Sequence, residues 1–487
     1  MATFLTSEQS SVRVTFYRKA TGALSVVSGS LPMDGARFGS KAPYVTSLST
    51  QNALGQGGKF VCTLKVPPGF DVLNELSDDD WVDIELGRHG VYWHVLRGLV
   101  DEVRQNTSVS GNGTTVSDVT VVGSSFQKVW DTTPIWFSGM STSNNIAQAK
   151  LANWSHIEPP DSIVLSFLRK YTELLASFGR ANWDMPPGLA AKGETFSKLW
   201  LYDTSGFEKV YLARRSININ YLFVSGNVWQ ACNSWADPQY CELFTEILPK
   251  DGLTGLSADP DMVLGLPTDV STMAVVFRDK PYVIGPHGAA PRSKRGLSSP
   301  FFQLPHVKVP RNHLVGTDLG KSGYERYNAF FSGIDLNDTN GVTAQSIATP
   351  LWSPRDMARH GMRRMDANSR YIGKELFYNS LTGGLDGYIS LLRSRLRDWY
   401  CLNPTYLQGT LRFGRALPQL KVGTRLSLTD TGVVQSTYYV EQVSHTYSPA
   451  QGIRTTVGVT RGYRGTDTDH LKHLTDVIST YELGTIK

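Results

Sequence analysis

The chain has 487 residues, of which 40% are hydrophobic and 19% charged, and its formal net charge is +5. This length corresponds to about three or four domains, with enough apolar residues for true cores. The charge is too mild for a dedicated nucleic-acid-binding domain, in which Lys and Arg usually gather on one face. The four cysteines match no zinc motif, and no apolar run of about 18 residues indicates a membrane span.

The first 125 residues carry the period-two alternation of half-buried β-strands. β-branched and aromatic residues alternate with polar ones in segments separated by Gly-, Pro- and Ser-rich stretches. Strands are predicted at residues 11–17, 24–27, 59–65, 81–86, 91–97, 99–103 and 114–123. Because the later segments follow one another through short turns, this block predicts an antiparallel barrel or sandwich.

The middle of the chain has a mixed pattern. Residues 161–178 follow two prolines and repeat apolar side chains at helical spacing, which predicts one amphipathic helix. The segment 285–300 is rich in Gly, Pro and basic residues and predicts an exposed loop that proteases cut early. Further elements are predicted as a helix at 227–236 and strands at 242–248, 272–278 and near 306–316 and 323–334.

A helical section is predicted over 353–400, where Ser353 caps the first turn and Pro354 occupies it. Strands then return at 410–413, 425–428, 438–443 and 455–460. The basic clusters at 355–370 and 393–397 are expected to be solvated helix faces or ion-pair partners at a subunit contact. The two β blocks, one near each end of the chain, are compatible with two similar barrels.

A search for catalytic chemistry finds nothing specific. The densest acidic run, Asp78 to Asp80 with Asp83 and Glu85, is better explained as a charged loop leading into an exposed strand face than as a glycosidase pair. His470 and His473 share a helix face but are expected on a surface helix rather than at a metal. No nucleophile elbow, phosphate loop or HExxH motif occurs, so we predict no enzyme, no cofactor and no metal.

Three stretches resemble the baseplate hub proteins of contractile phage tails, which are similar to the hub part of type VI secretion spikes. The first is Asp80 to Val103, with a strand ending in Gly and then Leu-Val-Asp-Glu-Val. The second is 228–249 followed by 275–282, a helix–strand–strand unit. The third runs from Leu411-Arg-Phe-Gly-Arg415 to Arg461-Gly462. They lie in family order and cover about a third of the chain.

This resemblance implies a structural protein of the virion tail, made and assembled in the host cytoplasm. It implies a homotrimer that adapts a six-fold tail tube to a three-fold central spike. The implied partners are the tail tube protein and the central spike protein, with tape-measure and baseplate wedge proteins as further candidates. Genome DNA would pass through the lumen without specific binding.

The expected fold class is mainly β with α, an α+β chain with two tube-like antiparallel β-barrels and inserted mixed and helical subdomains. The predicted domains are a first barrel (1–128), an inserted mixed subdomain (129–225), a hub middle domain (226–345), a helical segment (346–402), strands of the second barrel (403–465) and a C-terminal tail (466–487).

Residues that face a partner subunit are predicted from strand periodicity. In 438–443 one face carries Tyr439, Glu441 and Val443, a mixture that favours a subunit contact over a pure core. Trp81, Asp83 and Glu85 are the corresponding candidates in the first block. Two alternatives to the hub stay open, namely a tail-associated cell-wall hydrolase that uses the acidic cluster and a carbohydrate-binding β module that uses some of the 11 tryptophans.

Overall fold

The computed structural model describes residues 10–18, 22–29, 43–66, 71–88, 91–109, 115–134, 164–165, 167–169, 172, 196, 199–204, 226–256, 271–282, 300–334, 349–369 and 384–484. The loop predicted at 285–300 lies outside these ranges except at its last residue. Of the helix predicted at 161–178, residues 164, 165, 167–169 and 172 are helical. Within the described ranges, no helix is long and apolar enough to cross a membrane.

A 13-stranded sheet dominates the molecule. Its N-terminal strands are β1 (Ser10–Arg18), β2 (Gly22–Gly29), β3 (Tyr44–Ala53), β4 (Gln56–Val66), β5 (Trp81–Arg88), β6 (Val91–Val109) and β7 (Thr115–Ser125). Its C-terminal strands are β11 (His306–Pro310), β12 (Leu314–Gly320), β16 (Leu407–Phe413), β17 (Arg425–Asp430), β18 (Val433–Ser448) and β19 (Gly452–Arg464). All neighbours pair antiparallel except β11 and β17, which are parallel. The predicted class, mainly β with α, is confirmed.

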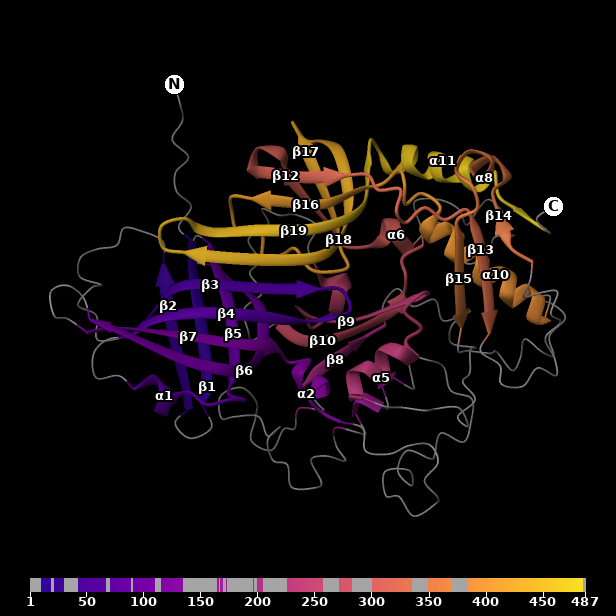
Figure 1. Cartoon of the computed structure of the whole chain (residues 1–487). Helices are drawn as coiled ribbons and strands as arrows, with labels where there is room; N and C mark the ends of the chain where they lie inside the picture. Colours follow the sequence, from indigo (N-terminus) through magenta and orange to yellow (C-terminus); the bar gives the residue numbers. More distant parts are fainter. Residues whose placement is uncertain are drawn as a thin grey trace, which may run out of the picture.

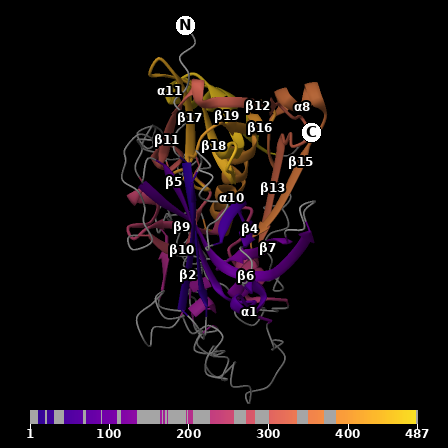
Figure 2. The ribbon, with the colours of Figure 1, turned by 90° about the vertical axis from the view of Figure 1, so that its left-hand side faces the viewer.

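The two β blocks join edge to edge. β18 pairs with β17 and β19 and also with β3, in a register that runs from Gln442 opposite Ala53 to Tyr447 opposite Leu48. The path of paired strands therefore runs from β12 through β18 and β3 to β2. In two views the yellow β18 and β19 lie above the indigo and purple strands of the first block (Figures 1 and 2). Over the described residues, the strand pairing forms one continuous sheet and not two separately closed barrels.

Each half of this sheet has an apolar core, which forms because apolar and polar side chains alternate along its strands. In β1 the buried positions alternate, so Val12, Val14 and Phe16 are fully buried while their neighbours are partly exposed. They pack with β4, β5 and β7, and a separate cluster forms among β11, β16, β18 and β19. The predicted alternation is thus the physical basis of both halves.

A second, three-stranded sheet packs against the large one. It consists of β8 (Trp200–Asp203), β10 (Ser271–Asp279) and β9 (Cys241–Pro249), with β8 parallel and β9 antiparallel to β10. α5 (Val228–Trp235) begins at Asn227, whose side chain accepts a hydrogen bond from the Gln230 amide in a capping box. The predicted helix and strands of this unit are confirmed to within about one residue at most of their ends.

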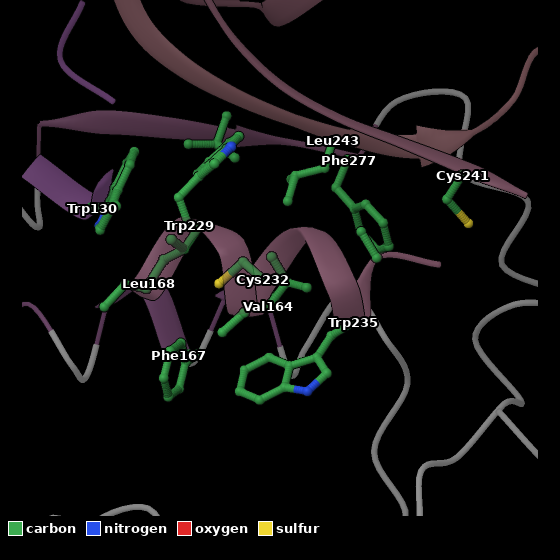
Figure 3. Close-up of a cluster of buried hydrophobic side chains, with 14 of the residues drawn as sticks. Trp130, Val164, Phe167, Leu168, Trp229, Cys232, Trp235, Cys241, Leu243 and Phe277 are labelled. Atoms are coloured by element: carbon green, nitrogen blue, oxygen red, sulfur yellow. The ribbon is translucent and has the colours of Figure 1, made fainter. Parts of the chain in front are cut away.

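α5 lies between the three-stranded sheet and the helical residues near 165 (Figure 3). Trp229, Cys232 and Trp235 project from α5, and all three are buried. α2 (Lys128–Asp131) adds Trp130, whose ring stacks on Trp229 with 5.9 Å between ring centroids. This aromatic cluster gives the region a core although much of residues 129–225 shows no regular sequence pattern.

A third sheet and the remaining helices follow in the C-terminal half. The sheet has the order β15 (Arg364–Ser369), β13 (Ala329–Ile334), β14 (Leu351–Trp352) and β20 (Glu482–Leu483). The helices are α1 (Val72–Glu75), α6 (Pro300–Gln303), α8 (Pro354–His360), α10 (Gly384–Tyr400) and α11 (Asp467–Ile478), with short 3-10 turns at Gly252–Gly255 and Arg311–His313. The four cysteines are buried and none forms a disulfide.

The helical section predicted over 353–400 is wrong in one part. Ser353 caps α8 and Pro354 starts it, as predicted, but α8 ends at Gly361, which has φ +70°. β15 follows and pairs in parallel with β13, so this section contains a strand between two helices. Glycine tolerates the left-handed conformation at which the helix stops, whereas other residues are strained there.

The predicted domain boundaries stay predictions. Strand pairing crosses the predicted boundaries after residues 345 and 402, because β11 pairs with β17 and β12 pairs with β16. Residues 306–320 thus share a sheet with residues 407–430, although the predicted middle domain ends at residue 345. α11 begins just inside the predicted tail and buries Leu474 and Ile478.

Candidate functional site

The acidic residues singled out in β5 are buried, which corrects the expected exposed strand face. Asp83 is 1% exposed. Arg97 on β6 binds it with both Nε and Nη2, at 2.6 and 2.8 Å, and the Tyr17 hydroxyl donates a third hydrogen bond at 2.9 Å. Burial by itself would raise the pKa of Asp83, but the charge of Arg97 and the hydrogen bonds from Arg97 and His94 hold that pKa well below its ordinary value.

Glu85 has its own cationic partner. It forms an ion pair with Arg13 on the neighbouring strand β1, and the Arg13 guanidinium lies 4.4 Å from the centre of the Tyr92 ring. Glu85 is 2% exposed. Asp83 and Glu85 therefore bind cations inside the sheet, and they do not form a pair of carboxyl groups across an open cleft, as a glycosidase requires.

His94 extends this network to the three-stranded sheet. Its Nε2 lies 3.1 Å from Asp83 Oδ1 and its Nδ1 lies 2.7 Å from the hydroxyl oxygen of Ser271, the first residue of β10. With the proton on Nε2, the ring donates to Asp83 and accepts from Ser271. The order serine, histidine, aspartate is that of a nucleophilic triad. Here, however, His94 and Ser271 are both buried, and Arg97 already binds both oxygens of Asp83.

A second buried group connects the three-stranded sheet to β18. The Tyr439 hydroxyl donates to Glu242 on β9 at 2.8 Å. Arg278 on β10 binds Glu242 through Nε at 3.0 Å and donates to the Gly423 carbonyl oxygen at 2.8 Å. Glu242, Arg278 and Tyr439 are each at most 5% exposed. Such a group is stable only when every member has a partner, which this geometry provides.

A third buried group lies between these two. Glu246 on β9 accepts hydrogen bonds from the Asn52 side chain of β3 at 3.0 Å and from the Val422 amide at 3.3 Å. Lys421 lies 3.6 Å from Glu246 and donates to the His94 carbonyl oxygen at 3.4 Å. Burial lowers the pKa of Lys421, and the charge of Glu246 opposes that shift. We call these three groups together the polar junction, because they connect the three-stranded sheet to both halves of the large sheet.

Five of the six predicted interface residues are buried inside the single chain. Tyr439, Val443 and Trp81 are at most 4% exposed, as are Asp83 and Glu85. Only Glu441 is partly exposed, and it accepts a hydrogen bond from Thr460 at 2.8 Å. A side chain enclosed by its own chain leaves no surface for a neighbouring subunit. Tyr439 belongs to the polar junction, Glu441 binds Thr460, and Val443 packs in an apolar cluster, so contacts within the chain account for the mixed face of β18. A subunit contact at these residues stays a prediction.

The basic cluster at 393–397 is also buried, against expectation. Arg393, Arg395 and Arg397 on α10 are at most 7% exposed. Arg395 binds Asp279 at the end of β10 at 3.0 Å and lies over the Tyr282 ring. This contact and the contact between His94 and Ser271 could not be predicted from the sequence, for the same reason. The partners are more than 100 residues apart, and no local pattern joins them.

Comparison with protein families finds no match, and comparison with curated proteins finds none either. Among solved structures, the chain is similar to the tail protein from Neisseria meningitidis MC58, with a TM-score of 0.45 and 10% identity over 92% of this chain and 96% of that one. It is similar to the 43 kDa tail protein of prophage MuSo2 from Shewanella oneidensis, with a TM-score of 0.45 and 9% identity over 93% and 98%.

A chain of the Francisella PdpA–VgrG complex has a TM-score of 0.43 and 9% identity over 94% of this chain and 53% of that one. Tail proteins thus stand among the structures similar to this chain, the class that the sequence resemblance named. All three TM-scores are below 0.5, so neither family membership nor function follows from them.

Replacement of Tyr439 by Phe tests the polar junction. The variant removes the hydroxyl that donates to Glu242, and a buried carboxylate then loses one of its donors. We expect a loss of about 1–3 kcal/mol in the free energy of unfolding, measured by denaturant titration. Tyr438→Phe, at a neighbouring position of the same strand, should change it by less than about 0.5 kcal/mol. Equal stability of wild type and Tyr439→Phe would contradict the role assigned to the hydroxyl.

Stability should fall as the pH is lowered from 7 to 5. Burial lowers the pKa of His94, of His306 and His470 to about 4, and of His445 to about 3. The unfolded chain, with histidine pKa near 6.5, then binds protons that the folded chain does not, so acid favours unfolding. At pH 5 the loss is on the order of 2 kcal/mol for a fully buried histidine.

The variant His445→Gln measures the contribution of one such group. Its free energy of unfolding should depend less steeply on pH between 7 and 5 than that of the wild type. If the free energy of unfolding of His445→Gln depends on pH as steeply as that of the wild type, His445 takes up protons as readily in the folded chain as in the unfolded chain. That result would contradict the lowered pKa of His445.

Proposed function

We propose that this chain is the structural hub of a tail baseplate. The observation that carries the proposal is where the fold places the three resembling stretches. The first contributes β5 and β6, and the third contributes β16 to β19, all within one continuous sheet. The second contributes α5, β9 and β10, which connect to both halves of that sheet through the polar junction. Segments hundreds of residues apart thus form one connected unit, which consists of the large sheet, the three-stranded sheet and the polar junction between them. We call this unit the frame.

This frame suits a protein that transmits load and not one that turns over a substrate. Buried ion pairs and hydrogen bonds fix the relative position of packed elements, because moving one element leaves charges without partners. The acidic side chains that an enzyme would use bind arginine or lysine within the core. Within the described residues, no group of three or more His, Cys, Asp or Glu residues is arranged to bind a metal.

The proposed assembly is a homotrimer whose three subunits supply six β blocks in a ring. Such a ring would adapt a six-fold tail tube to a three-fold central spike in the virion, with tape-measure and wedge proteins as further neighbours and DNA passing through the lumen. The chain would be assembled in the host cytoplasm. Each subunit offers two halves of one sheet, one from each end of the chain, and this supports a six-block ring.

The subunit contact is proposed at β12 instead of at Tyr439. β12 stands at one end of the path of paired strands, and an edge strand of this kind is a template for a neighbouring chain. Val315 on β12 is 68% exposed, and Tyr324, just beyond it, is 94% exposed. Exposed apolar side chains beside a strand edge to which no described strand pairs fit a surface that another subunit covers.

Replacement of Val315 by Asp should weaken the trimer. A buried, unpaired carboxylate at the contact opposes association, so the mass measured by sedimentation should shift toward the monomer while circular dichroism stays unchanged. Val109 serves as the matched control, because it is 69% exposed near the end of β6, and Val109→Asp should assemble as the wild type does. A wild type that stays monomeric at high concentration, or a Val315→Asp trimer, would contradict the proposed contact.

The cell-wall hydrolase remains the second candidate, because Ser271, His94 and Asp83 stand in triad order. We expect no turnover of peptidoglycan by the purified chain, since these side chains are buried and Asp83 is held by Arg97. Turnover that both Ser271→Ala and Asp83→Asn abolish would establish the hydrolase and overturn the structural proposal. Six of the eight tryptophans in the described ranges are buried and are not available to bind a carbohydrate.

A further inference from the structure

A pocket lies where α11 packs beside the ends of β12, β16 and β19, away from the polar junction. Its volume is about 490 Å³, within the range of small-ligand sites. Leu407, Tyr406 and Tyr463 form part of its wall, and the basic side chains of Lys321, Arg464 and His473 lie around it with His470. Lys321 directly follows β12, Arg464 ends β19, and both histidines come from α11.

The basic groups of this pocket lack acidic partners. Over the described part of the chain, neither Lys321 nor Arg464 forms an ion pair within 4.0 Å, although many other basic side chains do. The acidic residue that lines the pocket, Asp469, accepts hydrogen bonds from the amide and hydroxyl of Thr466 at 3.1 and 2.7 Å. Its carboxylate thus helps to cap α11 and stays negatively charged, so Lys321 and Arg464 together leave one net positive charge around the pocket.

His470 gives a second and independent indication of a ligand. It is 3% exposed, its ring stacks on Tyr463 with 4.0 Å between the centroids, and it lines the pocket. Its Nε2 is buried and has no hydrogen-bond partner in the described structure. Buried polar atoms of native proteins almost always have a partner. This unpartnered nitrogen, on a ring that belongs to the lining of the pocket, is therefore a candidate donor to a bound ligand.

We propose that this pocket binds a small anion of carboxylate or phosphate chemistry. Lys321 and Arg464 pair with its charges, and the ring nitrogens of His470 and His473 donate hydrogen bonds to its oxygens. Two cationic side chains, one just after β12 and one at the end of β19, favour a ligand with two acidic groups over a single monovalent ion. The stacked rings of His470 and Tyr463 add an apolar wall against which the body of the ligand can lie. The proposal does not depend on the hub function.

Calorimetric titration of the full chain tests the pocket, with inorganic pyrophosphate as one probe and succinate as the other at constant ionic strength. At least one probe should bind with a stoichiometry of one per chain. Lys321→Gln and Arg464→Gln should each weaken that binding about tenfold, because each removes a charge-assisted hydrogen bond. Both side chains are exposed, so the variants should fold, and circular dichroism checks this.

Lys59→Gln is the matched control. Lys59 is an exposed lysine of β4 that forms no ion pair within 4.0 Å with any residue that the structure describes, and its replacement should leave binding unchanged. Binding of pyrophosphate alone assigns a phosphate-bearing ligand, and binding of succinate alone assigns a carboxylate. Failure of both probes to bind would overturn the proposal. An equal loss in Lys59→Gln would overturn it too, because the anion would then respond only to overall charge.

Discussion

The relative position of the sheets depends on the buried charges of β9 and β10. Glu242 and Glu246 lie on the same face of β9, four residues apart, and each binds a different part of the large sheet. Desolvating a carboxylate is unfavourable by several kcal/mol, and only a nearby cation with well-placed donors offsets it. Arg278 and Lys421 provide those cations. Sliding the three-stranded sheet by one residue would separate Glu246 from Lys421. It would also remove the hydrogen bonds that tie the Glu242–Arg278 pair to Tyr439 and Gly423, so one relative position of the sheets is favoured.

This arrangement explains why polar residues in the strands are not signs of a surface. In β5, seven consecutive positions are buried although two are acidic. A strand with both faces covered loses the simple alternation by which burial is predicted. The charged positions of β5 and the aromatic and acidic positions of β18 face other elements of the same chain. A mixed face of this kind marks an intramolecular contact as readily as a subunit interface.

Local elements were predictable from the sequence where local physics decides them. Asn227 and Gln230 form the capping box of α5, and the alternation of β1 follows its buried positions. The interior of the predicted helical section was not predictable, because β15 exists through its parallel pairing with β13, a contact at long range. The same holds for the polar junction, whose partners His94 and Ser271 are 177 residues apart. Tyr439 is buried beside Glu242 and Arg278, which lie 197 and 161 residues away in the sequence, and strand periodicity alone contains no information about such partners.

The pairing of β3 with β18, which we call the seam because it joins the two halves of the large sheet, imposes an order on folding. Leu48 lies opposite Tyr447 in this seam, so 399 residues (447 − 48) must be synthesised after β3 before its partner strand exists. At about 5–20 residues per second, translation takes roughly 20–80 s to supply it. During that interval the nascent N-terminal block presents β3 as an open edge, which favours pairing with other nascent chains on the same messenger. Expression at lower density of ribosomes, or with a chaperone that covers such edges, favours the correct seam over aggregation.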